Sequence, residues 1–337
     1  MEVNVVQFFH PDGEHGIDDE KAMVKHWNKG AHQRKFLKAK GRYVVDPKHG
    51  ILSDVTPLLF RGEWEPDSRV TYVFDNDSDL WPKYQHEPFL KLGRKFKSAK
   101  LSCSDMLDEQ EKNADEKGYC VAGCGDDACQ NTDPFVFSDA FYYSLCKQLK
   151  KSKDSEDGEV TTWLSQLAIG SLILFGSKVT DENGENAFAL DTVFVVAKSC
   201  PYTMETYKEN LDDFVPQHYG YIMGFDHILG HSTKLPLTCY KGATPEEPVA
   251  GMYSFVPCQT ADVEGKSFRK VLIKETDGLS DFINVNNTRG ARGVALVSVE
   301  RALEVWTRVC EIVKTQGCLQ GVDSVSYTHL RAHETSQ

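Results

Sequence analysis

The stretch that decides the fold runs from Gly170 to Lys198 and reads GSLILFGSKVTDENGENAFALDTVFVVAK. Its two apolar runs, Ser171–Phe175 and Phe188–Ala197, are rich in the aliphatic, β-branched and aromatic side chains typical of buried strands. Between them, Gly176–Asn186 is a polar loop rich in Gly, Asn and Asp. Two apolar strands around one polar loop predict a long β-hairpin.

Further strands and a helix are predicted on either side of this hairpin. Val3–Phe9 and Pro57–Trp64 have the composition of strands. Ser298–Gln316 is predicted to be a helix because its apolar residues recur at three- and four-residue steps, and Gly317 is the expected stop. Asp139–Leu149 also shows helical spacing. These elements predict an α+β fold, with a β-rich body and a helical C-terminal appendage.

Composition excludes several classes of protein. The chain has 337 residues, with 38 Lys and Arg against 50 Asp and Glu, and a formal net charge of −12. This acidity argues against binding driven by the nucleic-acid backbone, but it allows a local basic groove or a pocket for one base. No run approaches the ~18 apolar residues of a membrane span. Met1–Phe9 lacks the features of a secretory signal, so a cytoplasmic protein without a membrane partner is expected.

The last residues are expected to be foreign to the protein. Residues 325–335 (VSYTHLRAHET) resemble the translation of a sequencing adapter along their whole length. Residues 324–337 are therefore set apart as a non-native tail, and the native chain is expected to end near Asp323 or Ser324. The closely spaced His329 and His333 are accordingly not taken as a metal site.

Four cysteines in a polar, glycine-rich stretch are candidate zinc ligands. Cys120, Cys124 and Cys129 lie close together, and Cys103 precedes them. Structural zinc takes four ligands in tetrahedral geometry, and turn-forming glycines allow several thiolates to converge. The spacing differs from the two-residue knuckle of common zinc sites. A loop with unrelated reduced thiols is therefore the alternative.

A second candidate site lies near predicted strand ends in the N-terminal half. The stretch from His10 to His15 places two imidazoles and a carboxylate directly after a strand, where sites are commonly built. A neutral His can act as a base or a metal ligand, and paired carboxylates beside an Arg suit metal binding or acid–base chemistry. Solvated surface turns account for the same residues. The candidate catalytic set is His10, Glu14, His15, Arg61, Glu63, Glu65 and His86.

The densest basic cluster is confined to one short stretch of this acidic protein. Its side chains could contact phosphate groups, or they could form a solvated polar face. The members of the cluster are Arg34, Lys35, Lys38, Lys40 and Arg42.

The motifs of the common nucleotide-hydrolysing and redox enzymes are missing, because the sequence has no P-loop, dinucleotide-binding glycine motif, nucleophile elbow or HExxH.

About residues 131–196 resemble a PUA-like barrel of the kind found in EVE, ASCH and some nucleotide-modification-associated domains. The order of short segments carries the resemblance: Thr132-Asp133-Pro134-Phe135, Cys146-Lys147, Gly170–Ser177 and Leu190–Val196. In those families this order builds a barrel around a pocket for a base or a modified nucleotide. The resemblance implies a ligand-binding set of Asp133, Phe135, Lys147, Phe175 and Ser177.

Three functions remain open at this point. The first is recognition of a nucleotide or nucleobase, associated with base modification in nucleic acid. The second is an enzyme that uses the N-terminal set on a nucleotide or a phosphorylated substrate. The third is an interaction module held together by zinc, the candidate cofactor. The expected domains are a body at 1–260 with a barrel core at about 131–200, an α/β appendage at 261–323, and the tail at 324–337.

Overall fold

The computed structural model describes residues 2–9, 33–64, 133–136, 139–155, 158–203, 205–216, 219, 235–260, 270–287 and 290–324. Within these ranges the side chains of residues 33–40, 57, 61–64, 290, 292–294 and 324 are not described. The described part of the chain is rich in strands and has few helices, as expected for the α+β class. None of its helices combines the length and apolar character that a membrane crossing requires.

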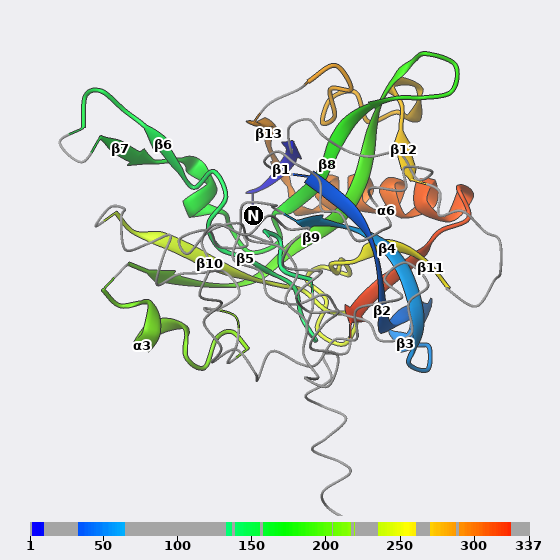
Figure 1. The fold of residues 1–337 in the computed structure, drawn as a ribbon, viewed down its shortest axis with the longest axis horizontal. Helices are drawn as coiled ribbons and strands as arrows, with labels where there is room; N and C mark the ends of the chain where they lie inside the picture. The colour runs from blue at the N-terminus through cyan, green and yellow to red at the C-terminus, as the bar shows by residue number, and fades with distance from the viewer. Residues whose placement is uncertain are drawn as a thin grey trace, which may run out of the picture.

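The predicted hairpin is confirmed and forms the centre of the fold, but its loop is shorter than predicted, because residues 176–180 extend the first strand and only residues 181–185 form the turn. Strand β8 (Leu172–Thr180) pairs antiparallel with β9 (Asn186–Tyr202). In Figure 1 this pair is the long green hairpin, and β9 continues well beyond β8 to pair with β10 (Leu237–Gly242). The register shifts by one residue after Phe175, where Asp191 is the extra residue on β9. Such a bulge bends the strand locally and increases its twist.

The hairpin lies inside a sheet of seven strands in the order β13-β1-β8-β9-β10-β5, and β12 also pairs with β9. The predicted N-terminal strand is confirmed as β1, which runs parallel to β8 and antiparallel to β13. The bounds of the other strands are β1 (Glu2–Phe9), β5 (Tyr142–Tyr143), β10 (Leu237–Gly242), β12 (Val271–Ile273) and β13 (Gly290–Ser298).

A second sheet of five strands has the order β14-β11-β4-β2-β3, and β14 also pairs with β2. No closed barrel is found in the described part of the chain, so the PUA-like barrel stays a prediction. Strands β6 and β7 form a separate hairpin. The bounds are β2 (Gln33–Asp46), β3 (Ile51–Leu52), β4 (Thr56–Trp64), β6 (Leu149–Lys151), β7 (Glu159–Thr161), β11 (Val256–Thr260) and β14 (Leu319–Ser324).

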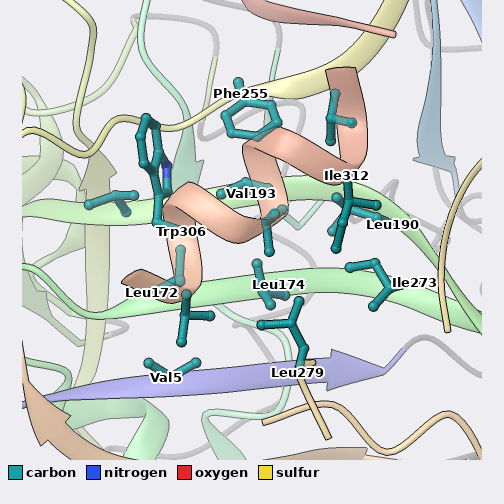
Figure 2. Packing of buried hydrophobic residues seen from close by; sticks show 14 of the residues in the cluster. Val5, Leu172, Leu174, Leu190, Val193, Phe255, Ile273, Leu279, Trp306 and Ile312 are labelled. Carbon is teal, nitrogen blue, oxygen red and sulfur yellow. The ribbon is translucent and has the colours of Figure 1, made fainter. Parts of the chain in front are cut away.

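Two hydrophobic clusters use side chains that alternate along the central strands. On β9, Val193 and Val195 belong to the cluster that contains helix α6, whereas Phe194 and Val196 belong to the other cluster. This period of two is the geometry of a strand covered on both faces. Figure 2 shows the cluster that contains α6, in which Trp306 and the apolar residues of this helix lie over the hairpin.

The predicted C-terminal helix is confirmed as α6 (Val299–Thr315). Ser298 caps it by accepting a hydrogen bond from the backbone N–H of Arg301 at 3.3 Å. Gly317, with a φ of 77°, follows its end in the left-handed conformation that favours glycine. Other helical segments in the described part of the chain are α3 (Tyr207–Leu211) and the 3-10 turns Trp163–Gln166 and Glu275–Asp277.

The prediction of a helix over Asp139–Leu149 is wrong. This stretch contains the short strand β5, a turn and the start of β6. A helix requires the N–H groups of Leu145 and Cys146 to bond to carbonyl groups four residues earlier, but the Asp133 carboxylate accepts both. Lys147 has a φ of 61°, which an α-helix does not contain.

Elements on both sides of residue 260 share the same sheets. Strand β12 pairs with β9 and β13 with β1, while β14 pairs with β11 and β2. The predicted C-terminal segment therefore contributes strands to both sheets of the body, and its helix α6 covers one face of the larger sheet. The division into domains at residue 260 stays a prediction.

An ion pair connects the tip of the central hairpin to the segment after β12. The Lys274 ammonium donates to Asp181 Oδ2, and the backbone N–H groups of Asn183 and Glu185 donate to Asp181 Oδ1, both at 2.9 Å. Chiefly because of the Lys274 hydrogen bond, the pKa of Asp181 falls from an ordinary 3.8 to about 2. Because folding lowers this pKa, the ionised Asp181 stabilises the folded state at pH values above 3.8. This stabilisation is lost as the pH falls to about 2.

We expect Asp181→Asn to lower the free energy of unfolding at pH 6. The difference in this free energy between the variant and the unaltered protein should shrink between about pH 4 and about pH 2. Urea denaturation across this range measures the difference. Asp154→Asn, at an exposed carboxylate, is the matched control and should change stability little at every pH. A deficit in Asp181→Asn that stays constant down to pH 2 would contradict the assignment.

Candidate functional site

The ligand-binding residues implied by the PUA-like resemblance lie almost entirely inside the protein. Asp133, Phe135 and Phe175 are fully buried, Ser177 is 3% exposed, and Lys147 is half-buried. Their surroundings show what each side chain does in the folded chain.

Asp133 holds a turn of the backbone. Its Oδ1 accepts the N–H of Ser144 at 2.9 Å, and its Oδ2 accepts the N–H groups of Leu145 and Cys146, both at 2.6 Å. A buried carboxylate that accepts several backbone N–H groups satisfies donors that have no helical partner here. Asp133 thus fixes the conformation of the loop that leads to Lys147.

Buried tyrosines hold the same loop from other sides. The hydroxyl of Tyr202 donates to Ser144 O at 2.8 Å, that of Tyr219 to Ser144 Oγ at 2.7 Å, and that of Tyr143 to Cys146 O at 2.7 Å. Burial raises the pKa of all three phenols well above its ordinary value, so they remain protonated donors. The loop is therefore hydrogen-bonded to buried side chains on several sides.

Lys147 leaves this loop with a positive φ and reaches the end of β1. Its ammonium donates to Phe9 O and lies 4.5 Å from the centroid of the Phe8 ring. The Phe8 ring in turn packs against Phe175 at 4.7 Å between centroids. Strained backbone that the surroundings over-determine is often found at functional sites. The structure thus brings Asp133, Lys147 and Phe175 into one neighbourhood.

The other two implied residues have separate surroundings. The Phe135 backbone pairs with Tyr142, and its ring meets the Tyr219 ring edge-on at 5.2 Å. Ser177 lies on β8 beyond the bulge, where its Oγ has no hydrogen-bond partner among the described residues. A pocket formed by all five residues stays a prediction.

Most residues of the two other predicted sites lie outside the described residues. For Arg61 and Glu63 the structure describes only the backbone, which belongs to β4. Within the described ranges no group of three or more His, Cys, Asp or Glu side chains is placed to hold a metal ion. The residues outside are His10, Glu14, His15, Glu65 and His86 of the catalytic set, and the zinc candidates Cys103, Cys120, Cys124 and Cys129.

A charged cleft lies where β2 of the second sheet meets β9 and β10 of the first. Its volume is about 280 Å³, just below the ~300–1,000 Å³ typical of small-molecule pockets. It is lined by three cationic, three anionic and several small residues: Arg42, Lys198, Lys241, Asp139, Glu246, Glu247, Ala140, Ala197, Gly242 and Thr244. Of these, only Arg42 belongs to a cluster that the sequence analysis singled out.

Lys198 and Lys241 are directly opposite each other in the antiparallel pairing of β9 with β10. Residues in such a pair point to the same face of the sheet with their Cβ atoms about 5 Å apart, and like charges placed this way destabilise the sheet. Glu247 partly compensates, with its Oε2 at 3.6 Å from the Lys198 ammonium. The Lys241 ammonium lies 5.9 Å from the centroid of the Tyr142 ring.

Arg42 reaches the cleft from β2, on the other side. Its Nε donates to Asp323 Oδ2 at 2.6 Å, and its backbone N–H donates to Oδ1 at 3.0 Å. The hydrogen bond to Asp323 raises the pKa of the guanidinium, and the charges of Glu246 and Asp139 act in the same direction. Arg42 is thus a fixed, permanently charged donor.

The segment that directly precedes β5 forms one wall of the cleft. Asp139 and Ala140 line the cleft and directly precede Phe141, whose carbonyl accepts the N–H of Gly242 at 2.7 Å. A Cβ on Gly242 would lie 2.6 Å from Ser254 Oγ, so only glycine allows this close approach. The cleft therefore combines three cationic and three anionic side chains in a small space.

No family model, curated protein or solved structure matches this chain, so the interpretation of the cleft depends on its own geometry.

Proposed function

We propose that the protein recognises a nucleotide and that the charged cleft binds its phosphate group. The observation that carries the proposal is the directly opposed pair Lys198 and Lys241, which faces the same cleft as Arg42. Two like charges on neighbouring strands cost stability, and a bound phosphate would turn this repulsion into attraction to both lysines. Binding sites commonly contain arrangements of residues that lower the stability of the protein but are required for its function.

The three cations come from three strands, so the fold rather than a flexible loop sets their positions. The guanidinium of Arg42 suits phosphate oxygens, and the two ammonium groups add point charges. Small residues such as Ala197 and Thr244 line the cleft beside the cations. Recognition of the base, and the association with base modification, are parts of the proposal that rest on the PUA-like resemblance.

The direct test is titration calorimetry with the nucleoside 5′-monophosphates of adenine, guanine, cytosine and uracil, each compared with its nucleoside. We expect at least one monophosphate to bind at least about tenfold more tightly than its nucleoside, which corresponds to ~1.4 kcal/mol. Binding should weaken as salt is added, because exposed charges such as Lys198 are screened. Equal affinity for nucleoside and monophosphate would contradict a phosphate site.

Lys241→Met removes one ammonium and keeps most of the apolar stem. We expect it to weaken monophosphate binding by about tenfold. The same change should leave the free energy of unfolding unchanged or raise it by up to ~0.5 kcal/mol, because a like-charge pair is relieved. Calorimetry and urea denaturation measure the two effects.

Lys150→Met is the matched control, since Lys150 is exposed on β6 and does not line the cleft. It should leave monophosphate binding unchanged. If Lys241→Met binds as tightly as the original chain, the cleft is not the phosphate site.

A further inference from the structure

We infer that the cleft selects nucleoside monophosphates against di- and triphosphates, because carboxylates at its edge repel every phosphate beyond the first. The inference rests on the proposed function and specifies its substrate class. The cleft contains as many anionic as cationic side chains, namely Asp139, Glu246 and Glu247 against Arg42, Lys198 and Lys241. Such a site has no surplus positive charge for a long polyphosphate.

The carboxylates lie close to the cations that would bind the phosphate. Glu247 is ion-paired with Lys198 at 3.6 Å, and the charges of Glu246 and Asp139 act on the Arg42 guanidinium. A single phosphate, with a charge of about −2, can replace Glu247 as the partner of Lys198. Each further phosphate adds negative charge among these carboxylates, and like charges at about 4 Å repel by ~1 kcal/mol even in water.

The turn after β10 fixes the acidic edge. Thr244 Oγ1 accepts the backbone N–H of Glu247 at 3.2 Å, and the N–H of Ala243 donates to Val195 O at 2.8 Å. Glu246 and Glu247 are therefore held beside the cleft although both residues are exposed. The cleft volume of about 280 Å³ also favours a small ligand.

The test compares the monophosphate, diphosphate and triphosphate of one nucleoside by calorimetry, once with EDTA and once with Mg²⁺. We expect the monophosphate to bind at least about tenfold more tightly than the triphosphate in EDTA. The double variant Glu246→Gln with Glu247→Gln should reduce this ratio to about threefold or less, mainly by strengthening triphosphate binding. Both residues are exposed, so the fold should tolerate the changes.

The matched control is Glu205→Gln with Glu209→Gln, two exposed carboxylates that do not line the cleft. It removes the same net charge and should leave the ratio unchanged. If all three phosphates bind equally, or if Mg²⁺ makes the triphosphate the tightest ligand, the inference fails while the proposed function stands. A preference for the monophosphate that survives the Glu246/Glu247 change also overturns the inference. If none of the nucleotides binds, the proposed function itself fails.

Discussion

Replacing Asp133 with alanine is expected to lower the free energy of unfolding by at least about 3 kcal/mol. The fully buried carboxylate accepts three backbone N–H groups, from Ser144, Leu145 and Cys146. Alanine leaves all three donors without this partner, and an unsatisfied buried donor costs about 1–3 kcal/mol. The measurement is urea denaturation followed by circular dichroism.

Asp133→Asn provides a graded comparison, because its single side-chain oxygen can still accept part of these hydrogen bonds. Its loss should be clearly smaller than that of Asp133→Ala. It also keeps the experiment informative if the alanine variant does not fold. Asp154→Ala, at an exposed carboxylate, is the control and should change stability by less than ~0.5 kcal/mol. A loss below about 1 kcal/mol in Asp133→Ala would show that other groups hold the loop.

Replacing Trp306 with alanine is expected to cost about 3–5 kcal/mol. The side chain lies on α6 above the central hairpin (Figure 2). Its ring meets the Tyr253 ring edge-on at 4.9 Å between centroids. Its Nε1–H also donates to Tyr253 O at 2.9 Å. Removing the ring leaves a cavity between α6 and the sheet and deprives a buried carbonyl of its donor.

Trp306→Phe helps to separate the two contributions, because it keeps an aromatic ring and loses the N–H donor together with a smaller part of the packed volume. We expect it to cost about 1–2 kcal/mol. Trp163→Ala, at a side chain that is 36% exposed, is the control and should cost less than either Trp306 variant. If Trp306→Phe and Trp306→Ala proved equally destabilising, the hydrogen bond rather than the packing would dominate.

Local periodicity was sufficient to predict the elements whose apolar residues recur at regular intervals along the chain. The two strands of the hairpin and the helix at Val299–Thr315 were predictable because burial on the two faces of a strand, or on one face of a helix, appears directly in the order of residues. The same reasoning failed over Asp139–Leu149. There the buried carboxylate of Asp133 takes the N–H groups that a helix would need.

The candidate site was only partly predictable. Arg42 belongs to a basic cluster that stands out in an acidic chain. Lys198 and Lys241 are isolated lysines in the sequence, and nothing near either of them indicates a site. They become a pair only through the register of β9 with β10. Register depends on turn geometry and on the burial of whole faces, neither of which a short sequence window contains.

Local sequence patterns were enough to predict the β-rich α+β class, the central hairpin and the C-terminal helix, because periodic burial is a local property of the chain. Three further features depend on contacts between distant segments. The tertiary structure placed β12, β13 and β14 in the sheets of the N-terminal body, it made Asp133 the support of a backbone loop, and it brought Arg42 to the lysine pair. The physical reason is that contacts between distant segments follow from strand pairing and side-chain packing, which local patterns do not specify.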